Sequence, residues 1–249
     1  IISNANEADL TCSGIIVKDP YAAYAIVSSL FVAFKNPYKD IVTNFTIHET
    51  SRIDDSAIIG PNVYIGPNCI IGAHSIIHAN CSLVMNVEIG QNSIIHPNSV
   101  LGSDGFGYAP DNLGYKKIEQ LGKLIIGDSV EIGAGCTIDR GAIDHTEVHD
   151  GVKLDNQVHI AHNVILGKNS AIAASCAIAG STVIGQNLQM GGLSGILGHL
   201  TICDDVLIGA HTLITKNIND PGDYVGIMPA QEKKDWAKSS VFIKKRNYK

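Results

Sequence analysis

Acid and base side chains are concentrated in residues 154–164. Asp155, His159 and His162 alternate there with apolar residues at regular positions, so all three polar side chains should face outward. An imidazole takes up and releases a proton near neutral pH, which suits it to general base catalysis. Whether one of these histidines can act so depends on what lies beside it in the fold.

Aliphatic residues return at every sixth position in two long stretches, a period that fits neither an α-helix nor an antiparallel meander. It is typical of a hexapeptide-repeat β-helix, in which each hexad gives a short strand and a corner. Small residues recur inward four positions later, and Gly often follows the aliphatic residue, where a Cβ would clash. We predict an all-β fold, a left-handed parallel β-helix. The aliphatic positions are Ile41, Ile47, Ile53, Ile59, Ile65, Ile71, Ile77, Leu83, Ile89, Ile95 and Leu101, then Leu154, Ile160, Leu166, Ile172, Ile178, Ile184, Met190, Ile196, Ile202, Ile208 and Ile214.

The coil length singles out His162. Three hexads make one coil of 18 residues, so Gly180 should lie one coil above His162, and Gly198, beside His199, two coils above. Adjacent coils are separated by about 4.8 Å. This predicts a groove with a base at one end. The Gly180 N–H is suited to bind the oxyanion of an acyl transfer.

A metal site is the rival use of His159 and His162. Their spacing of three puts them on opposite faces of a strand, and only a corner could bring them together. The sequence contains no nucleotide-binding glycine loop and no nucleophile elbow. We therefore expect no metal, no cofactor and no covalent enzyme intermediate.

Breaks in the period divide the chain into three parts. Residues 1–40 do not follow it; a strand at 14–17 and a helix starting at Asp19-Pro20 indicate the remnant of an α/β domain whose beginning is missing. Residues 41–220 form the β-helix, with a hairpin-like excursion at 103–124 and a phase slip at 144–150. Residues 221–249 form a C-terminal helical extension.

Charge is unevenly distributed. The chain carries a net charge of −6, yet residues 231–249 hold seven basic and two acidic residues. A basic helix on an acidic body favours an acidic partner, although a solvated tail explains the charge equally well. No aromatic platform supports nucleic-acid binding. Inward-facing cysteines indicate a reducing compartment, and no apolar stretch is long enough to cross a membrane.

Several motifs together resemble one family, the UDP-3-O-(3-hydroxyacyl)glucosamine N-acyltransferases of lipid A biosynthesis, known as LpxD. The resemblance covers nearly the whole chain. The excursion and the segment at 137–142 are specific, whereas hexads alone would match any left-handed β-helix acyltransferase. The matching segments are GSDGFGYA at 102–109, KIEQLG at 117–122, IGDSVEIGA at 126–134, TIDRGA at 137–142, and DNQ at 155–157 with IAHNV at 160–164.

The resemblance implies a cytoplasmic homotrimer with its sites between neighbouring prisms. It implies transfer of a 3-hydroxyacyl group from acyl carrier protein to the 2-amino group of a UDP-3-O-acylglucosamine. His162 would be the general base, Asp155 its orienting carboxylate and Gly180 the oxyanion donor. The expected substrate contacts are His199, Asn156, Phe106 and Tyr108, and the expected contacts to the acidic carrier protein are Lys244, Lys245 and Arg246.

Two further hypotheses concern the length of the acyl chain and other functions that the same fold could serve. The coil order places Leu213 and Thr215 where an acyl tail would end, and the small Thr215 should admit a long chain. A related sugar O-acyltransferase could use the same base on a hydroxyl group. A non-catalytic trimeric scaffold would need only the hexads.

Overall fold

The computed structural model describes residues 2–3, 14–31, 36–39, 44–226 and 230–246 and divides the chain into two units, Ile1–Ile41 and Val42–Lys249. The first contains β1 (Ile2–Ser3), parallel to β2 (Ile15–Ile16), and α1 (Pro20–Ser29). As predicted, the carboxylate of Asp19 caps α1 by accepting the N–H groups of Tyr21 and Ala22 at 3.0 Å each. The predicted repeat at Ile41 lies outside the described residues.

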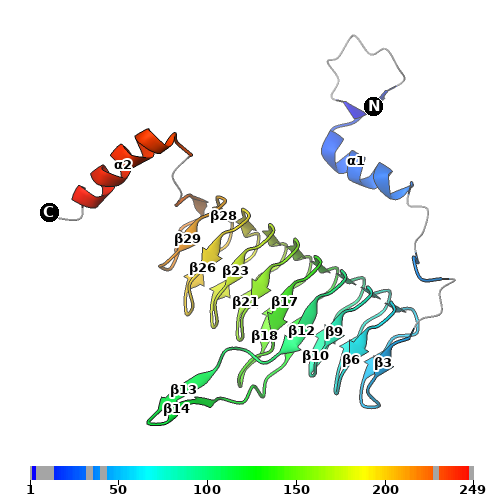
Figure 1. Ribbon diagram of the computed structural model, residues 1–249. Coiled ribbons are helices and arrows are strands. Elements are labelled where there is room, and N and C mark those ends of the chain that lie inside the picture. Colours follow the sequence, from blue (N-terminus) through cyan, green and yellow to red (C-terminus); the bar gives the residue numbers. More distant parts are fainter. Residues whose placement is uncertain (1, 4–13, 32–35, 40–43, 227–229, 247–249) are drawn as a thin grey trace. The chain divides into compact units, whose positions relative to one another are not determined.

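The second unit is a stack of parallel coils whose strands form three sheets (Figure 1). Sheet I contains β3 (Thr46–Ile47), β6 (Tyr64–Ile65), β9 (Ser82–Leu83), β12 (Val100–Ser103), β17 (Thr137–Asp139), β20 (His159–Ile160), β23 (Ala177–Ile178), β26 (Gly195–Ile196) and β29 (Leu213–Ile214). Sheet II contains β4 (Arg52–Ile53), β7 (Ile70–Ile71), β10 (Val87–Ile89), β15 (Leu124–Ile126), β18 (Thr146–Val148), β21 (Ile165–Leu166), β24 (Val183–Ile184) and β27 (Thr201–Ile202). Sheet III contains β5 (Ile58–Ile59), β8 (Ile76–Ile77), β11 (Ile94–Ile95), β16 (Glu131–Ile132), β19 (Lys153–Leu154), β22 (Ala171–Ile172), β25 (Gln189–Met190), β28 (Val206–Ile208) and β30 (Gly222–Tyr224).

The core is the axis of this prism, as the period predicts. Aliphatic residues such as Ile160 and Leu166 are fully buried, and so is the small inward residue Cys81. Burial raises the pKa of the Cys81 thiol to about 11, so this cysteine packs as a small apolar group. Buried serines satisfy corner carbonyls: the hydroxyl of Ser75 donates to the Gly90 carbonyl at 2.8 Å.

Each corner has two steric requirements, close approach of the coils and a left-handed backbone conformation, and a different residue meets each of them. Glycine after the aliphatic position allows coils to approach, since a Cβ at Gly66 would lie 1.8 Å from the Val84 carbonyl oxygen. The left-handed conformation falls two residues later, often on asparagine, as at Asn62 and Asn80. These asparagines also bond between coils, with 3.1 Å between Asn62 Nδ2 and Asn80 Oδ1. The six-residue period predicted the glycines, but it did not predict the role of the asparagines at the corners.

Two coils are longer than the rest. Regular coils repeat every 18 residues, whereas Ile89 pairs with Ile126 and Ile126 with Val148, steps of 37 and 22 residues. The first insertion is the predicted excursion, and its tip is the antiparallel hairpin of β13 (Tyr108–Asp111) and β14 (Gly114–Lys117). The second is the predicted phase slip. Figure 1 shows the hairpin leaving the side of the prism.

After β30 the chain ends in α2 (Lys233–Arg246), close to the predicted C-terminal helix. No helix in the described part of the chain is long and apolar enough to cross a bilayer.

The inward and outward residues of one strand give a stability prediction. Ile184 is 2% exposed and its neighbour Val183 is 41% exposed. Ile184→Ala should lower the free energy of unfolding by about 2–5 kcal/mol because it leaves a cavity. The matched variant Val183→Ala should cost much less. Urea denaturation of both measures the difference, and equal losses would contradict the inward assignment.

Candidate active site

Sheet I carries a pocket of about 430 Å³ around His162. Its floor follows one outward row of the sheet, in which His159, Ala177, Gly195 and Leu213 occupy successive rungs. Small side chains therefore leave an apolar groove with two imidazoles at one end. The lining residues are Phe106, His159, Ala161, His162, Ala177, Ile178, Ala179, Gly180, Gly195, Ile196, Leu197 and Leu213.

The His162 ring lies between two glycines. A Cβ on Gly180 would lie 3.0 Å from His162 Nε2, and a Cβ on Gly105 would lie 2.7 Å from Cδ2. The φ angles of these two glycines are not positive, so glycine is present for space rather than for conformation. The predicted neighbour Gly180 is thus beside the imidazole. Gly105, from the excursion, was not predicted in this role.

Asn163 determines which nitrogen of His162 is the base. Its side-chain Oδ1 accepts the Ala142 N–H at 3.0 Å, while Nδ2 donates to the Asp144 carbonyl at 3.1 Å. Since Oδ1 is the acceptor, the His162 Nδ1 that lies 2.9 Å away must carry a proton. The lone pair of the neutral ring is then on Nε2, which faces Gly180.

The carboxylate electrostatically coupled to His162 is Asp139, on β17. Burial raises its pKa, while a hydrogen bond from Ser103 and the nearby His159 and His162 act in the opposite direction. Ser103 Oγ donates to Asp139 Oδ1 at 3.0 Å, and Asp139 Oδ2 lies 3.9 Å from His159 Nε2. No sequence pattern distinguishes Asp139 from the other carboxylates.

Arg140 fastens the base of the excursion that carries Gly105. Its buried guanidinium donates to the carbonyls of Gln120 at 2.9 Å and Gly102 at 2.8 Å, and it pairs with Asp104. The hydrogen bond from Lys117 and then the charge of Arg140 hold the pKa of Asp104 below its usual range. Both ends of the excursion are therefore tied at one point, which positions Gly105 against the imidazole.

Other predicted residues are spread more widely. Phe106 lines the pocket, and its ring centroid lies 5.0 Å from that of Tyr108, which does not line it. His199 is exposed on a left-handed corner and its N–H donates to the Gly180 carbonyl at 3.0 Å. The Gly180 N–H has no hydrogen-bond partner within the described chain, so it is free to bind a ligand.

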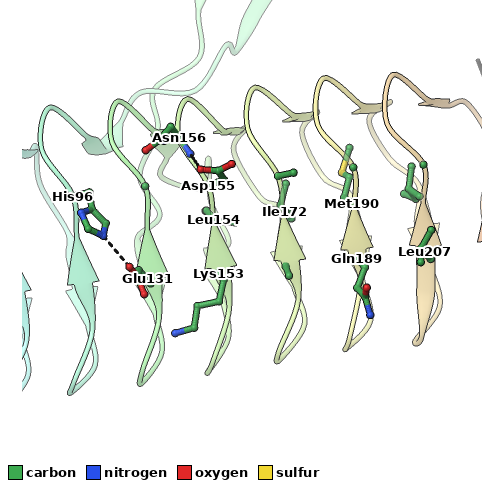
Figure 2. Close-up of a pocket in the computed structure, with 16 residues that line it drawn as sticks. His96, Glu131, Lys153, Leu154, Asp155, Asn156, Ile172, Gln189, Met190 and Leu207 are labelled. Atoms are coloured by element: carbon green, nitrogen blue, oxygen red, sulfur yellow. Dashed lines mark hydrogen bonds and ion pairs between the residues drawn. The ribbon is translucent and has the colours of Figure 1, made fainter. Parts of the chain in front are cut away.

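Asp155 does not orient the His162 of its own chain. It follows β19 of sheet III, whereas His162 follows β20 of sheet I. Its Oδ1 accepts the Asn156 N–H at 2.7 Å, and its Oδ2 accepts the Ala174 N–H at 3.1 Å. Figure 2 shows Asp155 and Asn156 in a second groove, of about 760 Å³, across sheet III. Within one chain, the structure does not bring the two residues of the predicted dyad together, because the corner separates them.

The remaining predictions concern the groove end and the terminal helix. Leu213 lines the pocket, and Thr215 does not. Lys244, Lys245 and Arg246 fall in α2, in the stretch whose side chains the structure does not describe. Among the described residues, no cluster of three or more His, Cys, Asp or Glu side chains could hold a metal ion.

The Asn163 contacts predict the tautomer of His162. In the neutral ring the proton should be on Nδ1, because Asn163 Oδ1 can only accept there. Nitrogen NMR of histidine-labelled protein, at a pH where the ring is neutral, measures this, with exposed His211 as reference. Asn163→Ala should mix the tautomers. A proton on Nε2 in the unaltered protein would contradict the assignment.

Comparison with known proteins agrees with this fold. The family model "Bacterial transferase hexapeptide (six repeats)" matches residues 145–180, and "GMPPB C-terminal domain" matches residues 41–105. The LpxA structure from Acinetobacter baumannii superposes with a TM-score of 0.68 at 28% identity, over 75% of this chain and 70% of that one. These matches confirm the left-handed parallel β-helix.

Curated relatives are more similar in sequence. The UDP-3-O-acylglucosamine N-acyltransferase of Delftia acidovorans is 48% identical over 235 residues, 92% of this chain and 69% of that protein. The protein of the same name from Bordetella pertussis is 53% identical over 148 residues, 58% of this chain and 41% of that protein. With such identity over most of the chain, the protein belongs to the UDP-3-O-acylglucosamine N-acyltransferase family.

Proposed function

We propose that the protein transfers a 3-hydroxyacyl group from acyl carrier protein to the 2-amino group of UDP-3-O-acylglucosamine in lipid A biosynthesis. The family relationship supports the acceptor. The observation that supports the chemistry is the position of His162 Nε2, the nitrogen that carries the lone pair in the neutral ring, beside the N–H of Gly180 and at the head of an apolar groove.

The geometry suggests the order of proton transfers. The sugar amine attacks the thioester carbonyl carbon, and His162 Nε2 takes the proton that the amine must lose. The Gly180 N–H binds the oxygen, which becomes negative as the C–N bond forms. The C–S bond then breaks, and the imidazolium returns the proton to the leaving thiolate. Asn163 stabilises the imidazolium through Nδ1–H without adding a formal charge.

An O-acyltransferase would need the same base and groove, so the product decides between the two. Incubation with 3-hydroxyacyl carrier protein and UDP-3-O-acylglucosamine should give a product heavier by one acyl group. Mild alkali should leave the new amide intact while releasing the existing ester. A new bond that mild alkali also cleaves would identify an O-acyltransferase. No product from a correctly assembled protein would favour a binding scaffold.

Replacing the base should remove most of this activity. His162→Ala should lower kcat by about 10²-fold to 10⁴-fold, the usual contribution of a general base. The matched control is His211→Ala, at an exposed left-handed corner outside the pocket lining, which should leave kcat unchanged. Steady-state kinetics of both variants, with folding checked by circular dichroism, makes the comparison. A His162 variant with near-normal kcat would remove this mechanism.

The groove floor suggests what limits the acyl chain. A Cβ on Gly195 would lie 3.2 Å from Leu213 Cδ1, so the Leu213 side chain lies over Gly195 and closes the row. Leu213→Ala should shift the preferred donor by about two methylenes toward longer chains, each buried methylene being worth about 0.8 kcal/mol. Thr215→Met is the control, because Thr215 lies outside the pocket lining. A donor series measures kcat/KM, and a shift only in the Thr215 variant would reverse the assignment.

The basic tail is the proposed docking site for acyl carrier protein. Replacing Lys244, Lys245 and Arg246 together by Glu should raise the KM for the acidic carrier protein at least tenfold, while hardly altering transfer from a short pantetheine thioester. Added salt should weaken carrier binding in the same way. Equal KM values for the carrier protein before and after charge reversal would show that the tail does not bind it.

The proposal also includes the oligomeric state of the protein and its cellular location. The pocket with His162 lies on sheet I and the groove with Asp155 lies on sheet III, so each prism has two surfaces for its neighbours, which supports a homotrimer with sites between them. His199, Tyr108 and Asn156 are the proposed contacts to the UDP-sugar, from this chain or its neighbour. Buried thiols support a reducing, cytoplasmic location. Light scattering of the purified protein should give three times the chain mass of 26.4 kDa.

A further inference from the structure

His159 is a polar group at the head of an apolar row. Its outward side chain precedes Ala177, Gly195 and Leu213 on successive rungs, and it lines the same pocket as His162. The mechanism above uses only one imidazole. A ligand that lies along this row therefore meets a hydrogen-bonding group close to its reacting end and small apolar groups beyond it.

The contacts of His159 leave a donor and an acceptor side by side. Its Nδ1 lies 2.8 Å from Thr137 Oγ1, and its Nε2 lies 3.9 Å from Asp139 Oδ2. The carboxylate on the Nε2 side favours a proton on that nitrogen, so Nδ1 accepts from the Thr137 hydroxyl. A separation of 3.9 Å is too long for a hydrogen bond. Neither the Nε2–H of His159 nor Asp139 Oδ2 has a hydrogen-bond partner among the residues that the structure describes.

Asp139 lies beside the pocket residue His159 but does not itself line the pocket, and its side chain is held in place. It is 8% exposed, and its Oδ1 is occupied by the hydroxyl of Ser103 at 3.0 Å. Its Oδ2 accepts no hydrogen bond from the described residues. Asp139 Oδ2 is not one of the buried unpaired atoms among the described residues, so a ligand that donates to it would take the place of solvent.

We propose that His159 and Asp139 together bind the hydroxyl group of the acyl donor. A hydroxyl can accept from His159 Nε2–H and donate to Asp139 Oδ2 at once, which a methylene cannot do. The Asp139 carboxylate would repel an anionic ligand, and the described residues offer too few ligands for a metal ion. The inference rests on the proposed function, since it assumes that the acyl carbonyl lies between His162 and Gly180.

The arrangement accounts for a 3-hydroxy position in particular. With the carbonyl carbon at His162, a chain whose tail reaches Ala177 and Gly195 can cross the row beside His159, which lines the same pocket. A hydroxyl two carbons from the carbonyl lies at that crossing. An unsubstituted chain of the same length would leave the Nε2–H and Oδ2 unpaired, which should lower kcat/KM about tenfold to 100-fold.

The test compares two donors of equal length, a 3-hydroxyacyl and an unsubstituted acyl thioester of the carrier protein. The measured quantity is the ratio of their kcat/KM values in wild type, His159→Leu, His159→Gln and Asp139→Asn. Leu removes the hydrogen bonds while keeping bulk, whereas Gln keeps a donor at a similar reach. If the Leu variant does not fold by circular dichroism, His159→Ala provides the same comparison.

Wild type should favour the hydroxylated donor at least tenfold, and His159→Leu should bring the ratio close to one. His159→Gln should restore part of the preference, and Asp139→Asn should reduce it. Equal losses on both donors in His159→Leu would overturn the inference, because His159 would then serve structure or general catalysis. A wild type that acylates the amine with neither donor would overturn the proposed function and this inference with it.

Discussion

The stacking of parallel coils at a fixed register is the constraint on which the site depends. Backbone hydrogen bonds between coils hold it: the Ala161 N–H donates to the Ile178 carbonyl and the Ser181 N–H to the His162 carbonyl, each at 3.0 Å. Because the repeat is 18 residues here, Gly180 lies directly above His162. The backbone hydrogen bonds between coils therefore hold a side chain one coil away as firmly as a neighbour within one strand. No side-chain contact is needed for this.

The two insertions break the register where the site needs more than a flat sheet can provide. Regular coils cannot contact the far side of an outward imidazole, since they lie only above and below it. Both insertions reach His162 and its neighbour: the excursion brings Gly105 against the ring, and the second insertion brings Ala142 and Asp144 to Asn163. The regular part of the fold supplies the groove, and the irregular parts orient the base at its head.

This division explains what the sequence could predict. The period was sufficient for the fold and for placing Gly180 and Leu213 on the same face as His162, because fixed coil arithmetic relates these positions. It does not relate Asp155 to the His162 of the same chain, because Asp155 is close in sequence but lies beyond a corner, on another sheet. Asn163 and Asp139 could not be assigned, since their contacts depend on insertions of 19 and 4 residues beyond the repeat, whose paths no period describes.

The proposed acyl transfer requires that the space above His162 Nε2 stays free of side chains. The most direct measurement is kcat of Gly180→Ala, whose Cβ would lie 3.0 Å from Nε2, against Gly192→Ala, where the nearest other atom would be a carbonyl oxygen at 3.3 Å. Both variants should fold, since each adds one methyl group at an outward corner. We expect a fall in kcat of at least tenfold for Gly180→Ala alone. Equal kcat values in the two variants would contradict it.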